Sequence, residues 1–265
     1  MSKSGAIRIG VGGWTYAPWR GTFFPEKLPQ KRELDYAARH LTSIEINGTF
    51  YGSQKPESFA RWRDETPDDF VFAVKGPRFA TNRKILAEAA PSIEKFFDSG
   101  VLELGDKLGP VNWQLPPFKR FDADDIETFL ALLPQEIDGR RIRHAIEARH
   151  DSFLVADFVA LARAHGVAIV CAGDSKYPTI PDATTDFVYA RLQGTQESEA
   201  LGYSAAALDR WARTARQWAA GETPKDLDPL GKAAPRRPRD VFLYVISGFK
   251  TRNPAAAMAL IERCA

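Results

Sequence analysis

Eight short apolar segments recur along this chain of 265 residues, and most of the stretches between them carry the periodicity of an amphipathic helix. Strands that alternate with helices form βαβ units, and the strands of such units lie parallel in one sheet. Eight units in about 250 residues match a (β/α)8 barrel of the triosephosphate isomerase (TIM) type. We therefore predict an α/β protein with a single-domain (β/α)8 TIM-type barrel over residues 1–265, and an open doubly wound sheet as the alternative.

The predicted strands and helices follow one another along the whole chain. The strands cover Ile7–Val11, Ser43–Ile46, Phe70–Lys75, Pro110–Leu115, Arg143–Glu147, Val167–Ala172, Phe187–Leu192 and Val241–Ile246. The helices cover Arg32–Leu41, Pro56–Glu65, Leu86–Phe97, Asp124–Leu133, Phe153–His165, Ala205–Ala219 and Pro254–Arg263.

Two stretches depart from this alternation. Residues 173–185 read "GDSKYPTIPDATT", with two prolines and no helical pattern, so we expect an irregular or missing helix after the sixth strand. Residues 221–240 are rich in proline and charge and include "PRRPR". Because this basic run stands alone, we interpret the stretch as a solvated connection and not as a patch that binds nucleic acid.

The composition excludes several classes of protein. The net charge is +2, with 36 basic and 34 acidic residues, which gives no overall attraction to nucleic acid or to an anionic membrane. The two cysteines, Cys171 and Cys264, form no ligand cluster and suggest a reducing compartment. The N-terminal "MSKSGAIRIG" lacks the apolar run of a secretory signal, and no segment is long and apolar enough to span a bilayer. We expect a cytoplasmic protein without a membrane partner; the oligomeric state stays open.

Polar residues recur in one of the two phases of the predicted strands. In a barrel strand, alternate side chains point toward the axis and toward the helices. Ile44 and Ile46 illustrate the apolar, helix-facing phase, and Glu45 and Asn47 the opposite one. The polar residues lie at the carboxyl ends of the strands, where TIM barrels have their active sites. We expect the following to converge there: Glu45, Asn47, Lys75, Asn112, Gln114, Glu147, Arg149, Arg191 and Gln193, with Asp174 just past the sixth strand.

The loop after the first strand combines two glycines with large aromatic residues. Gly12 and Gly13 leave room for a ligand to approach the backbone. Trp14, Tyr16 and Trp19, joined by Phe50 and Tyr51 after the second strand, could form a stacking surface for a flat base, an aromatic ring or a sugar face. The alternative is a hydrophobic cluster that covers the barrel end.

Histidine and cysteine are too scattered to predict a metal site. Of the four histidines, only His150 is expected at the mouth, whereas His144 falls in the helix-facing phase. Three carboxylates, Glu45, Glu147 and Asp174, could hold a hard cation, but the neighbouring lysine and arginines favour anion binding. We predict no metal and no cofactor.

Several motifs together resemble the DUF72 (YecE-like) family of uncharacterised proteins. They are "IGVGGWTY", "IEINGTFYG", "FVFAVKGPRFATN", "LGPVNWQLPPF", "AIEARHDSF" and "VYARLQG", and the resemblance runs from about residue 7 to about residue 260. It implies a TIM-type barrel without an agreed activity, for which a loose relation to sugar isomerases rests on the fold alone.

The resemblance also implies which residues belong to the site. The motif positions are Gly12, Trp14, Tyr16, Glu45, Asn47, Phe50, Tyr51, Lys75, Gln114, Pro116, Glu147, Arg149, His150, Asp174 and Arg191. The chain departs from the family at two places: Gln193 replaces a histidine, and Ser247-Gly248 replaces paired asparagines. A catalytic role built on those family residues does not carry over to this chain.

Two main hypotheses follow. In the first, the protein is an enzyme that acts on a small anionic or polyhydroxylated, sugar-like substrate. Glu45 or Glu147 is then the general acid or base, and Lys75, Arg149 and Arg191 hold the anion or a developing oxyanion. On this hypothesis a Glu147→Gln variant is inactive but stable. If Glu147 instead forms a structural ion pair with Arg149 or Arg191, the variant loses stability.

In the second hypothesis, the protein is a non-catalytic module that binds a nucleotide, nucleic acid or glycan on the aromatic loop. Nucleic acid is the less favoured of these ligands, and an affinity that falls steeply with salt would identify it. A third reading, a divalent-metal-dependent sugar isomerase, requires stoichiometric metal in the purified protein.

Overall fold

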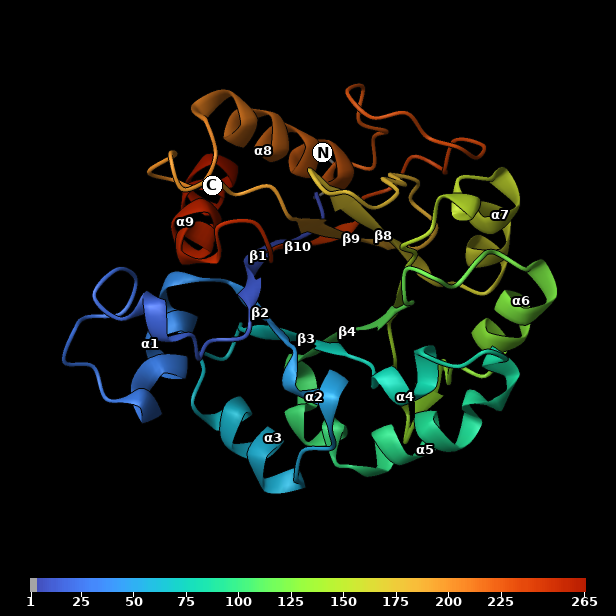
Figure 1. Cartoon of the computed structure of the whole chain (residues 1–265), viewed down its shortest axis with the longest axis horizontal. Helices are drawn as coiled ribbons and strands as arrows, with labels where there is room; N and C mark the ends of the chain where they lie inside the picture. Colours follow the sequence, from blue (N-terminus) through green and yellow to red (C-terminus); the bar gives the residue numbers. More distant parts are fainter. Residues whose placement is uncertain (1–3) are drawn as a thin grey trace.

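The computed structural model describes residues 4–265 and contains a closed barrel of eight parallel strands with helices around it (Figure 1). The order around the barrel is β1-β10-β9-β8-β7-β4-β3-β2. Each barrel strand therefore pairs with the barrel strand that follows it along the chain, and the last strand, β10, pairs with the first, β1, to close the barrel. The predicted TIM-type barrel is confirmed, and the doubly wound alternative is wrong. Residues 1–3, part of the stretch in which we expect no secretory signal, lie outside the described residues.

All eight predicted barrel strands are present, within a few residues of the predicted ends. They are β1 (Ile7–Gly12), β2 (Ser43–Ile46), β3 (Val71–Lys75), β4 (Leu108–Gln114), β7 (His144–Glu147), β8 (Ala168–Gly173), β9 (Phe187–Leu192) and β10 (Asp240–Val245). A two-stranded hairpin of β5 (Glu136–Ile137) and β6 (Arg140–Arg141), which the sequence pattern did not predict, precedes β7.

The helices lie outside the barrel or on the loops that follow its strands. They are α1 (Glu33–His40), α2 (Gly48–Tyr51), α3 (Pro56–Asp64), α4 (Arg78–Thr81), α5 (Ala90–Asp98), α6 (Ala123–Ala131), α7 (Ala156–Ala164), α8 (Ala205–Ala219) and α9 (Asn253–Cys264). The single-turn helices α2 and α4 directly follow β2 and β3, and the sequence pattern did not predict them. None of the helices in the described part of the chain is long and apolar enough to cross a membrane.

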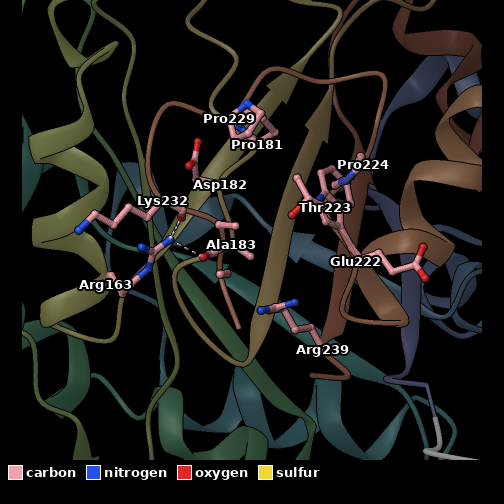
Figure 2. A pocket seen from close by; sticks show the side chains of 13 residues that line it. Arg163, Pro181, Asp182, Ala183, Glu222, Thr223, Pro224, Pro229, Lys232 and Arg239 are labelled. Carbon is pink, nitrogen blue, oxygen red and sulfur yellow. Dashed lines mark hydrogen bonds between the residues drawn. The ribbon is translucent and has the colours of Figure 1, made fainter. Parts of the chain in front are cut away.

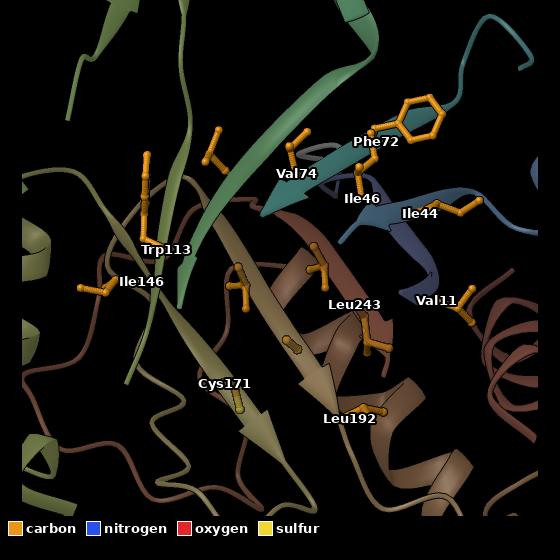
Figure 3. Close-up of a cluster of buried hydrophobic side chains, with 14 of the residues drawn as sticks. Val11, Ile44, Ile46, Phe72, Val74, Trp113, Ile146, Cys171, Leu192 and Leu243 are labelled. Atoms are coloured by element: carbon orange, nitrogen blue, oxygen red, sulfur yellow. The ribbon is translucent and has the colours of Figure 1, made fainter. Parts of the chain in front are cut away.

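The two phases of the strands face different environments, as predicted. Ile44, Phe72 and Val74 are fully buried between the barrel and the helices, and Figure 3 shows such side chains directed away from the barrel. Burying a large apolar side chain stabilises a fold by about 1.5–3 kcal/mol, so this layer fixes which face of each strand is turned inward. A second buried cluster contains Tyr189 and Tyr244 together with small residues of other strands, such as Ala73 and Ala145.

The segment between β8 and β9 contains no helix among its described residues, as the sequence predicts. A distant part of the chain, residues 221–239, packs against it between α7 and α8 (Figure 1). Asp182 accepts hydrogen bonds from the backbone N–H groups of Leu230 (2.9 Å) and Gly231 (2.8 Å). Arg163 of α7 donates to the carbonyl oxygens of Ala183 (3.3 Å) and Lys232 (3.1 Å), as Figure 2 shows. Two irregular segments thus occupy the place of the missing helix.

Most of residues 221–240 is exposed or half-buried, as predicted for a solvated connection, but its end at Arg239 is buried. Arg239 at the end of "PRRPR" is only 2% exposed, and its guanidinium donates to the carbonyl oxygens of Thr185, Arg237 and Pro235. These carbonyls satisfy a buried cation that has no carboxylate partner among residues 4–265. A cavity of about 20 Å³, close to the size of one water molecule, remains between the two segments (Figure 2).

The aspartate that joins the two segments gives a stability prediction. Replacing Asp182 by alanine removes a carboxylate that accepts hydrogen bonds from two backbone N–H groups. A hydrogen bond to a charged group stabilises a fold by about 1.5–3 kcal/mol. We expect Asp182→Ala to lower the free energy of unfolding in urea by about 2 kcal/mol or more. Asp228→Ala, in an exposed position of the same stretch, serves as the control and should change little. Equal stability of the two variants would contradict the assigned packing.

Candidate functional site

A cavity of about 570 Å³ opens at the carboxyl ends of the barrel strands. It lies between the loops that follow β1, β2 and β10 and the inward side chains of β3, β4 and β9. Its lining consists of Gly12, Gly13, Trp14, Thr15, Ile46, Asn47, Gly48, Phe50, Tyr51, Gln54, Trp62, Lys75, Gln114, Arg149, Arg191, Ile246, Ser247 and Lys250. The cavity occupies the position where TIM barrels bind their substrates.

Arg191 of β9 joins two carboxylates inside the barrel. Its Nη2 lies 3.0 Å from Glu45 Oε1 of β2, and its Nη1 lies 2.6 Å from Glu147 Oε2 of β7. All three side chains are at most 2% exposed. Buried charges are tolerated only when they are paired and hydrogen-bonded. The arginine therefore offsets the desolvation cost of the two buried carboxylates.

Further hydrogen bonds occupy the same carboxylates. The Tyr189 hydroxyl donates to Glu45 Oε2 (2.5 Å), and Arg149 Nε donates to Glu147 Oε1 (2.8 Å). The Asn112 amide lies between the two carboxylates, with Nδ2 at 3.4 Å from Glu45 Oε2 and 3.5 Å from Glu147 Oε2. Neither glutamate belongs to the cavity lining described above. They form a layer beneath it.

Three cations converge on a single amide oxygen above this layer. Gln114 Oε1 accepts from Arg149 Nη2 (2.7 Å), from Lys75 Nζ (2.8 Å) and, at a longer distance, from Arg191 Nη1 (3.4 Å). All four side chains line the cavity. A neutral carbonyl oxygen therefore lies at a point where the surrounding charges are positive.

The pKa values of the buried groups follow from these contacts. Burial opposes the charged form of Glu147, but Arg191, Arg149 and Lys75 outweigh it and lower the pKa of this carboxyl to about 2. Burial and the nearby Arg191 lower the pKa of Lys75 to about 8, against the opposing effect of Glu45 and Glu147. Glu147 is thus ionised at neutral pH and cannot act there as a proton donor, whereas Lys75 titrates close to neutrality.

The glycines and aromatic residues of the first loop have separate roles. A Cβ on Gly12 would lie 2.5 Å from Asn47 Nδ2, and Gly13 has a φ of 72°, which other residues rarely adopt. Trp14 packs edge-to-face against Trp62 of α3, with ring centroids 5.1 Å apart, and both line the cavity. Trp19 is fully buried and Trp14 packs against the core, which confirms the hydrophobic-cluster reading for these two rings. Trp14 also lines the cavity, and its stacking on a ligand stays a prediction.

Most of the predicted binding residues meet at the cavity, and some do not. The lining contains Gly12, Trp14, Asn47, Tyr51, Lys75, Gln114, Arg149 and Arg191 from the predicted set. Tyr16 is displaced toward Trp19, with ring centroids 5.5 Å apart. Gln193 lies one residue beyond the end of β9 and outside the lining.

Two predicted residues have other partners because the chain turns away after the strand. His150 Nδ1 accepts from the Ser152 backbone N–H (3.1 Å) and caps a short 3₁₀ helix. Asp174 has a φ of 50° and pairs with Arg210 and Trp211 at α8, at 3.0 and 2.6 Å. The alternation of strand phases no longer applies at these positions.

The lining also includes residues that strand phase could not identify. Gln54 comes from a loop, Trp62 from α3 and Lys250 from the 3₁₀ helix Lys250–Arg252. The Lys250 Nζ lies 4.3 Å from the centroid of the Tyr16 ring, which links it to the aromatic loop. Only the local presence of polar and aromatic residues near strand ends could have suggested them.

Residues 4–265 contain no group of three or more His, Cys, Asp or Glu side chains placed to hold a metal ion. His144, a histidine that could in principle bind a metal ion, is buried, and burial lowers its pKa to about 4. Its Nδ1 accepts from Trp113 Nε1 at 3.0 Å, on the helix-facing side as predicted. The residues present therefore do not fit the ligand set of a metal-dependent isomerase.

Comparison with known proteins identifies one family and several relatives. A family model described as "Protein of unknown function DUF72" matches residues 8–265. The Escherichia coli K12 "UPF0759 protein YecE" is 29% identical over 148 residues, which cover 56% of this chain and half the length of that relative. The Bacillus subtilis "UPF0759 protein YunF" is 25% identical over 194 residues, or 68% of this chain and 67% of that protein. A solved DUF72 family structure from Thermotoga maritima has the same fold, with a TM-score of 0.72 at 22% identity over 97% of each chain.

The buried ion pairs predict a cost for neutralising Glu147. Glu147→Gln leaves Arg191 and Arg149 each without one charged partner, and breaking a buried pair in this way destabilises proteins by about 3–5 kcal/mol. We expect a loss of this size in urea unfolding, compared with little change for the exposed Glu136→Gln. A Glu147→Gln variant of unchanged stability would instead support the acid-base role considered from the sequence.

Proposed function

Because the chain belongs to the DUF72 family, whose function is unknown, its activity has to be inferred from its site, and we propose that it binds a small anionic substrate at the barrel mouth. The anionic group is a phosphate or a carboxylate, and the rest of the molecule is polyhydroxylated or flat. The observation that carries this proposal is the convergence of Lys75, Arg149 and Arg191 on Gln114 Oε1.

The electrostatics of the cavity support an anion. In formal charge, the three cations around Gln114 exceed the two carboxylates beneath them by one, and Lys250 adds a further positive charge to the lining. Arg149 Nε and Nη2 both lie 2.8 Å from Glu147 Oε1, and the same Nη2 also donates to Gln114 Oε1, so the pairing with Glu147 fixes the guanidinium at the cavity. Arginine and lysine in such a low-dielectric pocket bind phosphate and carboxylate oxygens well.

The arrangement favours a supporting role for the two glutamates over the acid-base role expected from the sequence. Both are occupied by ion pairs and lie outside the cavity lining. In this proposal Glu45 and Glu147 hold Arg191 in place, and the substrate contacts are made by Lys75, Arg149, Arg191 and Lys250. The polar groups of Asn47 and Gln54 and the rings of Trp14 and Trp62 contact the remainder of the substrate.

A nucleotide or a single strand of nucleic acid is the second candidate ligand. Tyr51, Phe79 and Phe118, which follow three consecutive strands, are 65%, 57% and 70% exposed. The Arg78 guanidinium lies 5.8 Å from the centroid of the Tyr51 ring and 5.5 Å from that of Phe79. Exposed rings interleaved with cations are typical of surfaces on which bases stack. Affinity for an oligonucleotide that falls steeply with salt, without any response to sulfate, would favour this candidate.

Sulfate and citrate are simple probes of the proposed anion site. We expect both to raise the melting temperature of the wild-type protein and to give measurable heats in titration calorimetry. Arg149→Met should weaken sulfate binding about tenfold or more, because it removes a charged hydrogen-bond donor from the lining. Arg61→Met, at an exposed position on α3, is the matched control and should bind as the wild type does. If neither anion binds the wild type, or if the two variants bind equally, the proposal fails.

A nearly isosteric substitution at Gln114 also tests the anion site, because it adds a negative charge to the cavity where Arg149→Met removes a positive one. Gln114→Glu places a carboxylate where three cations meet, and it should raise the melting temperature while it abolishes sulfate binding. Gln114→Met keeps the charge unchanged and should retain sulfate binding at some cost in stability. A Gln114→Glu variant that still binds sulfate would show that the anion binds elsewhere.

A further inference from the structure

Lys75 differs from the arginines with which it shares the cavity. Its Nζ donates to Gln114 Oε1 at 2.8 Å and lies 4.0 Å from the centroid of the Phe50 ring. The side chain lines the cavity although the residue is only 6% exposed. Among the described residues, no carboxylate oxygen lies within ion-pair distance of this nitrogen, because Glu45 and Glu147 are paired with arginines. The cavity therefore contains an amine whose positive charge is poorly compensated.

This environment raises the share of neutral amine above that of an exposed lysine, although the charged form still predominates at pH 7. Burial against an aromatic ring disfavours the ammonium form, and the neighbouring Arg191 and Arg149 repel it. With a pKa of about 8, Lys75 holds on the order of 100-fold more neutral amine at neutral pH than an exposed lysine does. Lysines that are desolvated and placed beside another cation are activated as nucleophiles.

We propose that Lys75 forms an imine with the carbonyl carbon of the substrate bound in this cavity. The substrate class is then an aldehyde or ketone that also carries a phosphate or a carboxylate. The inference rests on the proposed function, because Arg149 and Lys250 are needed to hold the anionic group while the carbonyl carbon approaches Nζ.

The chemistry of this step balances without any further reactant. The lone pair of the neutral amine forms a C–N bond as the C=O π bond breaks, and one of the two nitrogen-bound hydrogens is transferred as a proton to the carbonyl oxygen, which becomes the hydroxyl of a carbinolamine. The second nitrogen-bound hydrogen and this hydroxyl then leave together as water, which gives the imine. Protonation of the imine nitrogen makes the adjacent carbon acidic, and this activates the substrate for proton transfer or for cleavage of a carbon–carbon bond.

Lys250 is the nearest competitor, and its surroundings differ. It also lines the cavity, and burial lowers its pKa. Its Nζ lies over the rings of Tyr16 and Trp19, at 4.3 and 5.9 Å, at the edge of the cavity. No arginine is among the causes that lower its pKa, so the effect that Arg191 exerts on Lys75 is absent there. The site of labelling therefore discriminates between the two lysines.

Reductive trapping on the full-length protein tests the proposal. The probes are glyoxylate with cyanoborohydride and pyridoxal 5′-phosphate with borohydride, and peptide mass spectrometry identifies the labelled lysine. We expect Lys75 to be labelled at least about tenfold faster than the exposed Lys55, with a rate that rises with pH to a midpoint near 8. Sulfate should slow labelling of Lys75 but not of Lys55. Lys75→Arg should lose the cavity label, and Lys55→Arg should retain it.

The outcomes separate this inference from the proposed function. Preferential labelling of Lys250, or labelling of Lys75 no faster than that of Lys55, overturns the imine. If sulfate binds the wild type and Lys75→Arg while no imine is trapped, the anion site stands and the covalent step is wrong. If neither sulfate binding nor trapping is observed, both proposals fail.

Discussion

The ion pairs that Arg191 makes with Glu45 and Glu147 are the interaction on which the rest of the site depends. The three residues come from β9, β2 and β7, which lie on different sides of the barrel, and they are almost completely buried. A buried arginine with only one partner, or two carboxylates without it, would be costly in a low-dielectric interior. The pairs therefore require the strands to keep the register in which these side chains meet, and the apolar layer outside the barrel supports the same register.

This layer of paired charges also decides what lies above it. Because both carboxylates are occupied by arginines, Lys75 receives no direct counter-charge and shares the oxygen of Gln114 with Arg149. The result is a gradient from neutralised charge inside the barrel to excess positive charge at the cavity. In the proposed function, the cations contact the substrate, and the two carboxylates act through the positions and the pKa values that they impose on those cations.

The sequence predicted the barrel and half of the site well, because both depend on the two-residue repeat of strands. Side chains such as Lys75 and Arg191 are in phase with the barrel interior and near a strand end, so their convergence could be expected. The match to the family model over residues 8–265 confirms the family resemblance. The depth of each side chain in the barrel could not be predicted. The strand phase gives the direction in which a side chain points, but not its distance from the mouth of the barrel. His150 and Asp174 were misplaced since each lies beyond its strand, where a cap or a turn with positive φ sets the direction. The burial of Arg239 depends on two segments that are distant in sequence.

The amide of Gln114 has a consequence for how the cavity would release a ligand. An anion that departs from three cations usually leaves them poorly solvated, which slows its exit. Here the carbonyl oxygen of Gln114 already accepts hydrogen bonds from the same donors, so it can take over from the departing oxygen. Because the Gln114 oxygen replaces the ligand oxygen in this way, the free energy of the empty cavity lies closer to that of the occupied cavity. This arrangement suits a pocket that exchanges its contents rapidly better than one that stores them.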